Sequence, residues 1–522
     1  MIDGQLKPVT GSDSGAADAG APVSLPWPIA GALPLLLAIL IALVTCFHGL
    51  AAKSLWFDEA FSVALTRLDW TSMWHVITQQ EANMMLYYAL LHFWLQLGTG
   101  EFVARAASTV FAVATLVPLY ALGRHLLGQR QAAIAVMLMV VNSFFVRYAQ
   151  ELRGYSLVLL LTTTASYLFL IAIEKPSWKR WGVYVVVSAL AVYAHFFGAL
   201  VVAAHALCLV VSRRRQISWA NFAVLYGLIW LLISPLVWLS WGRSVLGWII
   251  APSLGTVYRL FGALTGGGRT LLWTYFAVCV VAVASTMVGR PGYRRGSWNK
   301  VFLLSWLLVP LITTFVVSIT FKPIFVPRYL IVMLPPLVLL AASGIVALPR
   351  SWLRITTFIV MLALSIRGLV GWYKASPTED WRSASAYVLS TARPGDGMVF
   401  EAPYVRIPFE YYRRLRQGNS DGPTLVYLPV KRGAFDVLHP QISAVQNDTP
   451  AESHSPSRLW VVQSHVQPRL SYDSARIWMP LNVRGRYRIV DERSFRGIRV
   501  FLHAIHDSVP MMTSKSSNGA RR

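Results

Sequence analysis

The chain has 522 residues, of which 55% are hydrophobic and 13% charged, and its mean hydropathy is +0.52. Those values exclude a soluble globular domain, because the apolar residues fall in blocks of about 20, enough to cross a bilayer as a helix. The formal net charge is +24, but its distribution follows membrane topology, so we expect no nucleic-acid partner. The three cysteines, Cys46, Cys208 and Cys279, lie inside apolar blocks and form neither a disulfide framework nor a zinc pattern.

The first 28 residues are polar and small and contain one lysine. They lack the short apolar core and cleavage site of a signal peptide, so we expect a disordered cytosolic tail over 1–28. An all-α polytopic membrane domain with about 11 transmembrane helices is predicted over 29–372. The predicted spans are 29–50, 102–123, 131–149, 156–174, 183–195, 197–212, 221–241, 271–289, 301–320, 329–348 and 353–372.

Basic residues predict the orientation of these spans. Five short connections hold fourteen Lys and Arg and no Asp or Glu, at 124–131, 175–182, 213–220, 290–300 and 348–354. Cytosolic loops carry such an excess, so these connections are predicted to face the cytosol. A single tilted helix over 183–212 is the alternative to two short ones, but it would place the basic 213–215 outside. We therefore expect a multi-pass protein of the inner (plasma) membrane with its N-terminus cytosolic.

The first predicted outer loop, residues 51–101, begins with "SLWFDEAFS" and contains two adjacent acids, Asp58 and Glu59. Later in the same loop, "NMMLYYALLHFWLQL" (83–97) is apolar but too short to span a bilayer. Its Tyr, His, Trp and Gln side chains are typical of a helix that lies in the membrane interface.

Acidic residues are scarce, and their positions limit where carboxylate chemistry can occur. No Asp or Glu lies between Lys175 and Thr378. The acids that remain on the predicted outer face are Asp58, Glu59, Glu81 and Glu151, and the cations on that face are Arg153, Lys322 and Arg328. Carboxylates and cations at one membrane surface suit a reaction with an anionic lipid head group. For each residue, a solvated or paired structural role is the alternative.

The C-terminal region after the last span has a different composition, with more charges of both signs. "DWRSASAYVLSTA" is helix-like, and "PGDGMVFE" reads as a turn followed by a strand. Further strand-like runs are "TLVYLPV", "RLWVVQ", "YRIVD" and "IRVFLHAI". We therefore expect an extracytoplasmic α/β domain over 373–509 and a disordered stub over 510–522.

Several motifs in order resemble a known enzyme family. They are "WFDEAFS", "EANMMLYYALLHFW", "EFVARAASTVFAVATLVPLYALGRHLLG", "YAQELRGYSLVLLL", "YAHFFGALV", "PRYLIVMLPPLVLLAA" and "EDWRSASAYV", within roughly 30–400. Together the chain resembles the polytopic C-type (GT-C) glycosyltransferases related to protein O-mannosyltransferases and lipid A aminoarabinose transferases, of glycosyltransferase families 39 and 83. The resemblance implies transfer of a sugar from a polyprenyl-phosphate carrier to a cell-envelope acceptor on the outer side of the membrane.

The resemblance also implies site residues. In the family an aspartate of the first outer loop is the proposed base, which corresponds to Asp58, with Glu59 as a substitute. Transfer from a sugar phosphate also needs cations to stabilise the departing phosphate. Arg153 and Arg328 suit bidentate contacts with a phosphate, and Lys322 adds a point charge. The remaining candidates for donor binding are Glu81, Glu151, Tyr155 and His195.

One stretch departs from the family pattern. Relatives read His-Pro-Pro-Leu-Tyr-Tyr where this chain reads Asn83-Met84-Met85-Leu86-Tyr87-Tyr88, which puts in doubt any acceptor or metal contact of that histidine. No His and Cys cluster is present, so no tightly bound metal is expected, and Mg²⁺ held by phosphate and a carboxylate stays an alternative. Two other functions remain open: a flippase that moves an anionic lipid head group, and a non-catalytic envelope scaffold.

Overall fold

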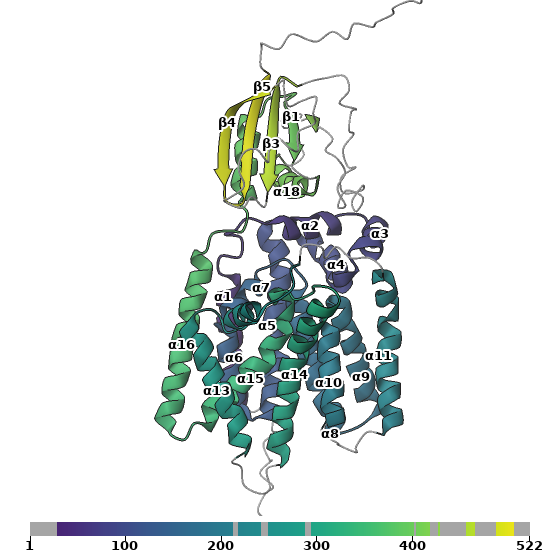
Figure 1. Cartoon of the computed structure of the whole chain (residues 1–522), viewed down its shortest axis with the longest axis vertical. Coiled ribbons are helices and arrows are strands. Elements are labelled where there is room, and N and C mark those ends of the chain that lie inside the picture. Colours follow the sequence, from purple (N-terminus) through teal and green to yellow (C-terminus); the bar gives the residue numbers. More distant parts are fainter. Residues whose placement is uncertain are drawn as a thin grey trace, which may run out of the picture.

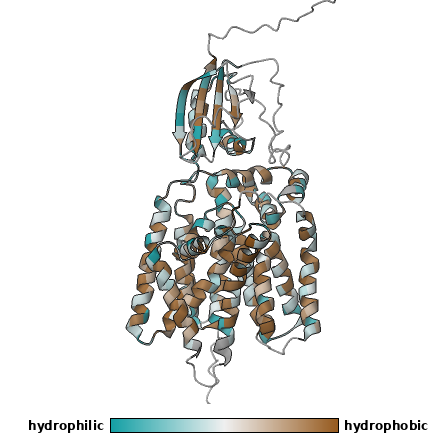
Figure 2. Cartoon of the chain, viewed as in Figure 1, coloured by the Kyte–Doolittle hydropathy of each residue, from teal (hydrophilic) through white to brown (hydrophobic). Residues whose placement is uncertain are grey.

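The computed structural model describes residues 29–211, 218–241, 249–287, 294–400, 403–417, 426–427, 456–464 and 487–505. A bundle of long helices carries a small sheet at one end, with short helices between the two parts (Figure 1). The hydrophobic residues concentrate along the bundle and the hydrophilic ones towards its two ends (Figure 2). The tails expected over 1–28 and 510–522 lie outside the described residues.

The prediction of an all-α polytopic membrane domain is confirmed, and every predicted span overlaps a helix of the bundle. In the described part of the chain, six helices are long and apolar enough to cross a membrane, or up to eight if two bent pairs each form one span. The predicted number of 11 therefore stays a prediction. The bundle comprises α1 (Ile29–Phe47), α5 (Glu101–Leu126), α6 (Gln129–Val140), α7 (Ser143–Ala149), α8 (Tyr155–Glu174), α9 (Trp178–Ala194), α10 (Gly198–Val211), α11 (Trp219–Ser240), α12 (Leu254–Leu264), α13 (Arg269–Met287), α14 (Arg294–Thr320), the 3₁₀ helix η3 (Pro327–Met333), α15 (Leu334–Ala347) and α16 (Ser351–Lys374).

Two breaks in the bundle bring short helix ends together. The chain bends by 63° between α6 and α7 and by 88° between α12 and α13. Asn142 begins α7, since its side chain accepts hydrogen bonds from the amides of Phe144 and Phe145. The same buried side chain donates to the carbonyl oxygen of Leu264 (2.9 Å), at the end of α12. Asn142 thereby joins the two breaks. Sequence reasoning did not predict α12.

Three helices of the first loop lie across the end of the bundle that faces the sheet (Figure 1). They are α2 (Phe57–Thr66), α3 (Trp70–Gln80) and α4 (Met85–Trp94), with 3₁₀ turns η1 (Ala82–Met84) before and η2 (Leu95–Leu97) after α4. The helix predicted over 83–97 therefore exists in three short pieces. The N-terminus of α2 places Asp58 and Glu59 in its first turn, where the helix dipole favours negative charge.

The C-terminal region is an α/β unit, as predicted. Its elements are α17 (Trp381–Thr391), β1 (Gly397–Phe400), the 3₁₀ turn η4 (Pro403–Val405), α18 (Arg406–Gln417), β2 (Val426–Tyr427), β3 (Arg458–Ser464), β4 (Tyr487–Phe495) and β5 (Ile498–Ile505). The strand order is β2-β1-β3-β5-β4. Strand β1 is parallel to β2 and β3, and β5 is antiparallel to β3 and β4. Helix α18 was missing from the sequence-based prediction.

This α/β unit docks directly on the first loop. The Tyr412 hydroxyl of α18 accepts a hydrogen bond from the amide of Leu55 (2.7 Å) and donates to Glu101. Arg382 of α17 pairs with the same Glu101 and donates to the carbonyl of Ala51 (2.7 Å). Because these contacts bracket the start of α2, the α/β unit helps to fix the position of the loop acids.

Candidate active site

The two adjacent acids of α2 have different surroundings. Glu59 is 1% exposed and accepts two hydrogen bonds from Arg105 of α5, Nε to Oε1 (2.8 Å) and Nη2 to Oε2 (2.5 Å). The amide of Leu152 also donates to Glu59 (3.0 Å). Both carboxylate oxygens of Glu59 are therefore engaged, and Glu59 ties α2 to α5 and to the loop that follows α7, although it also lines the cavity described below.

Asp58 is the more accessible of the two acids. Its side chain is 19% exposed, and its Oδ2 lies 3.6 Å from the Arg328 guanidinium of η3. The same guanidinium lies 5.5 Å from the Trp56 ring, just before α2. Asp58 and Arg328 are far apart in the sequence, and the structure places them together at the end of the bundle. A partly exposed carboxylate beside a guanidinium can accept a proton while the cation holds an anion.

Arg153 lies on the inner side of this pair. Its Nη1 donates to the Tyr88 hydroxyl (3.2 Å), the Asp58 carbonyl oxygen (3.4 Å) and Ser62 Oγ (3.5 Å). Only 9% of the residue is exposed. Burial raises the pKa of nearby Glu81 to about 7, although the charge of Arg153 acts to lower that pKa. Arg153 therefore connects α2, α4 and the α7–α8 loop beneath Asp58.

A cavity of about 160 Å³ lies beside these groups, and Lys53, Arg328, Glu151 and Trp372 are among the residues that line it. Burial raises the pKa of Glu151 to about 7, against the opposing charge of Arg328. One of its oxygens, Oε1, has no hydrogen-bond partner among the described residues. Burial, with the charges of Arg147 and Arg105, lowers the pKa of Lys53 to about 8. The cavity is therefore cationic, with an acid whose charge changes near neutral pH.

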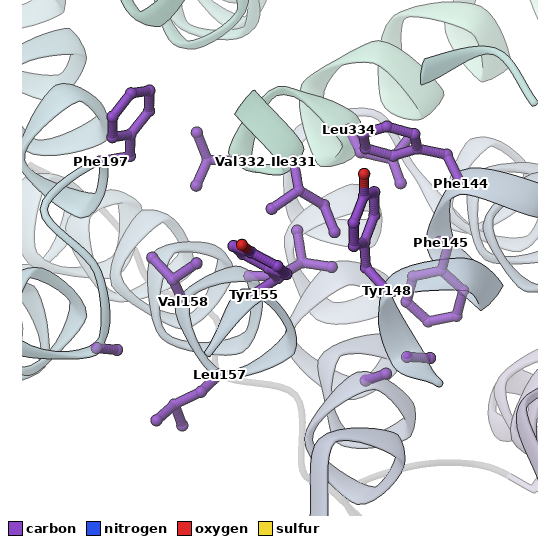
Figure 3. Close-up of a cluster of buried hydrophobic side chains, with 14 of the residues drawn as sticks. Phe144, Phe145, Tyr148, Tyr155, Leu157, Val158, Phe197, Ile331, Val332 and Leu334 are labelled. Atoms are coloured by element: carbon purple, nitrogen blue, oxygen red, sulfur yellow. The ribbon is translucent and has the colours of Figure 1, made fainter. Parts of the chain in front are cut away.

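Aromatic side chains form the other boundary of the site. The ring of Tyr329 lies 4.8 Å from the His195 ring and 6.1 Å from that of Tyr155. The ring centroids of Tyr155 and Tyr148 are 5.3 Å apart, and Figure 3 shows both side chains next to Ile331 of η3. The Tyr155 hydroxyl is buried and has no hydrogen-bond partner among the described residues. Tyr155 and His195 thus belong to the wall around Arg328.

Asn83, the departure from the family pattern, lies against this wall. Its Oδ1 accepts a hydrogen bond from the amide of Phe196 (3.2 Å), and its Nδ2 lies 3.4 Å from His195 Nε2. The next residue, Met84, also contacts a neighbouring loop, since its sulfur accepts a weak hydrogen bond from the amide of Gly154 (3.4 Å). In this chain the altered stretch therefore holds the α9–α10 turn and the α7–α8 loop in place.

The structure does not bring every predicted residue together. Lys322 is half-buried between α14 and η3, and within the described ranges no carboxylate pairs with it. Among the described residues, no group of three or more His, Cys, Asp and Glu could hold a metal ion. The sequence-based expectation about metals stays a prediction.

Three residues near the site were missed by sequence reasoning. Arg105 lies in the predicted span 102–123. Because an arginine at membrane depth needs a partner, its position in the sequence could have indicated that a nearby acid, Glu59, pairs with it. Lys53 directly precedes the "SLWFDEAFS" stretch. Glu379 is 2% exposed and accepts a hydrogen bond from the Phe57 amide (3.2 Å), one residue before Asp58. Only the tertiary fold brings Glu379 to α2.

Known proteins resemble this chain in structure over most of its length and in sequence over one part of it. The family model described as dolichyl-phosphate-mannose-protein mannosyltransferase matches residues 82–241. No curated protein sequence matches the chain. Apo ArnT from Cupriavidus metallidurans is similar in structure over 91% of this chain and 98% of its own, with a TM-score of 0.62 and 13% identity. The oligosaccharyltransferase AglB from Archaeoglobus fulgidus is similar over 92% of this chain and 75% of its own, with a TM-score of 0.51 and 10% identity.

The chain has the GT-C fold. The arabinofuranosyltransferase AftD from Mycobacteria is a further GT-C structure with a similar arrangement, over 91% of this chain and 40% of its own, with a TM-score of 0.50 and 13% identity. The predicted relation to GT-C glycosyltransferases is confirmed, and the chain is a multi-pass membrane protein. In this GT-C protein, Asp58, Arg328 and the adjoining cavity form the candidate active site.

Proposed function

We propose that this protein transfers a sugar from a polyprenyl-phosphate carrier to a cell-envelope acceptor, a glycolipid, polysaccharide or protein. The observation that carries the proposal is the pairing of Asp58 with Arg328 beside a cationic cavity. A lipid-linked donor is supported by the similar structure of ArnT, which was solved bound to undecaprenyl phosphate, and by AglB, solved with a dolichol-phosphate and an inhibitory peptide.

In the proposed step, an acceptor hydroxyl oxygen attacks the anomeric carbon of the donor sugar. The bond between that carbon and the phosphate oxygen breaks, and its electron pair leaves with the polyprenyl phosphate. Asp58 takes the hydroxyl proton as general base. Arg328, supported by Lys53, stabilises the departing phosphate, since it presents a planar guanidinium at the cavity.

The other predicted residues have supporting roles in this proposal. Arg153 holds α2 beneath the phosphate, and Glu59 acts through Arg105 as a structural anchor rather than as a base. Glu81 and Glu151 set the local charge, while Tyr155 and His195 shape the sugar side of the pocket. Lys322 stays a candidate for the phosphate from the segment before η3.

We further propose that residues 29–372 form the catalytic domain in the inner membrane and that the α/β unit of 373–509 lies outside the cytosol. The described connections at 127–128, 175–177 and 348–350 lie at the end of the bundle opposite the sheet (Figure 1). These connections belong to the predicted cytosolic loops, whose basic residues support this orientation.

The test is to replace Asp58 by Asn and to incubate the purified protein with radiolabelled polyprenyl-phosphate sugars and envelope extract. Loss of a general base should slow transfer by about 10²–10⁴-fold with donor binding retained. Asp69→Asn is the matched control, because Asp69 is an exposed helix cap in the same loop. A scaffold would be indifferent to Asp58→Asn, and a flippase would move the donor without breaking its sugar–phosphate bond. Near-normal transfer by Asp58→Asn contradicts the proposal.

A further inference from the structure

A second, larger cavity lies next to the candidate active site. Its volume is about 560 Å³, and it is enclosed by the start of α7, the α12–α13 break and the last turns of α16. We call it the glycine-loop cavity, after Gly266, Gly267 and Gly268 in its wall. Arg147 and Trp372 line both this cavity and the smaller one beside Arg328. The two cavities are therefore neighbours.

Three arginines from three separate elements line the glycine-loop cavity: Arg147 of α7, Arg269 of α13 and Arg367 of α16. All three side chains are exposed. Within the described ranges, no carboxylate forms an ion pair with any of them. The sequence explains part of this, since no acid occurs between Lys175 and Thr378. Three guanidinium groups around one cavity, none of them in an ion pair within the described ranges, can together hold a phosphate through charge-assisted hydrogen bonds.

The amides of Gly266 and Gly267 already donate to the carbonyls of Ala263 and Gly262, so the hydrogen-bond donors that add to these charges are the first amides of α13. Gly266, Gly267 and Gly268 have φ values of 95°, 93° and 89°, a region that favours glycine. Ser143 Oγ donates to the Gly266 carbonyl oxygen (2.8 Å), so that carbonyl is occupied by α7. The loop leads into α13, whose first amides have no partner within the helix, and Arg269, Thr270 and Leu271 of this first turn line the cavity. Those amides and the helix dipole favour an anion.

Close packing fixes the loop against α16. A Cβ on Gly368 would lie 2.3 Å from the Gly266 carbonyl oxygen, so only glycine permits this approach. The contact holds Arg367, the residue before Gly368, at the cavity edge. Because the loop and helix are locked together, the cavity is formed before any ligand binds, which lowers the entropic cost of binding.

We propose that the glycine-loop cavity binds the phosphate of a membrane lipid head group, as a second lipid site beside the active site. A lipid is favoured over free phosphate by the apolar side chains exposed on the same two helices. Trp273 and Phe276 of α13 are 58% and 59% exposed, and Ile366 and Val370 of α16 are 48% and 43% exposed. Acyl chains can cover these residues while the head group meets the arginines. The site does not involve Asp58, so it stands independently of the proposed transfer reaction.

The test is lipid binding to the purified full chain, measured by native mass spectrometry in detergent. The probes are dioleoyl phosphatidic acid, dioleoyl phosphatidylcholine with the same acyl chains, and sodium phosphate. The wild type should prefer phosphatidic acid. Arg269→Gln and Arg367→Gln should each lower its affinity about tenfold, since each removes a charge-assisted contact to phosphate. Arg354→Gln, at the other end of α16, is the matched control and should bind as the wild type does.

A second variant tests the cavity itself without changing its charge. Thr270→Trp should fill the space and reduce phosphatidic acid binding. Wild-type binding in both Arg269→Gln and Arg367→Gln, or equal binding of the two lipids by the wild type, overturns the proposal. Displacement of phosphatidic acid by millimolar sodium phosphate overturns the assignment to a lipid.

Discussion

The ion pair between Glu59 and Arg105 offers a direct test of how the two adjacent acids differ. We expect Glu59→Gln to destabilise the folded protein, whereas Asp58→Asn should leave its stability nearly unchanged. Glu59 accepts two hydrogen bonds from Arg105 and one from the Leu152 amide, and both members of the pair are buried. Removing one partner of a buried pair costs about 3–5 kcal/mol, because the other charge stays buried without compensation.

That cost corresponds to a loss of about two to four powers of ten in the folding equilibrium constant. It can be measured by reversible unfolding of the purified protein in mixed micelles, with Asp69→Asn as the control. The double variant Glu59→Met with Arg105→Met should recover only part of the loss. Arg105 also donates to the carbonyls of Leu50 and Lys53, and these would lose their donor.

The result that refutes this reasoning is a Glu59→Gln protein that does not transfer sugar although its free energy of unfolding lies within about 0.5 kcal/mol of the wild type, the usual range for surface changes. Glu59 would then act in the chemistry, and the base would move one residue along α2. Loss of transfer in proportion to the loss of folded protein supports the anchoring role.

Three further predictions concern the active site and its support. Arg328→Ala should lower donor affinity and turnover by about tenfold or more, and Arg328→Lys should retain only part of the wild-type affinity and turnover. Donor binding and single-turnover transfer measure these two quantities. Wild-type affinity in Arg328→Ala would assign this residue to packing. Glu151, whose pKa is raised to about 7, is neutral below that pH and anionic above it, where it competes with the donor for Arg328. Donor affinity should therefore fall as pH rises through 7. Glu151→Gln should remove this fall near pH 7 and leave the further loss above pH 8, where Lys53 loses its charge; an unchanged pH profile would exclude Glu151. Glu379→Gln weakens the contact to the Phe57 amide, so transfer should slow while donor binding stays, with exposed Glu492→Gln as the control; equal rates in both variants would contradict this role.

The sequence by itself determined the class of the protein and most of its helices. A block of about 20 apolar residues is long enough to cross the bilayer, and within the bilayer the backbone must form a helix to satisfy its hydrogen bonds. Hydropathy alone therefore places the long helices. The strands over 458–463, 487–491 and 498–505 followed from alternation and turn residues. The short α12 and α18 were not predicted, since neither has the length or the apolar content of a span.

The tertiary structure decided what each charged residue does. Asp58 and Glu59 are neighbours in sequence, yet the helix turns one towards Arg105 and the other towards Arg328, since successive helical positions face different directions. Glu379 reaches α2 only because the α/β unit docks on the first loop. Arg147, Arg269 and Arg367 are separated by about a hundred residues each, and only the bends at the two helix breaks bring them to one cavity. The spacing of apolar residues in the sequence indicates which face of a segment is buried. Which charged residues from different segments meet depends on how the whole chain packs.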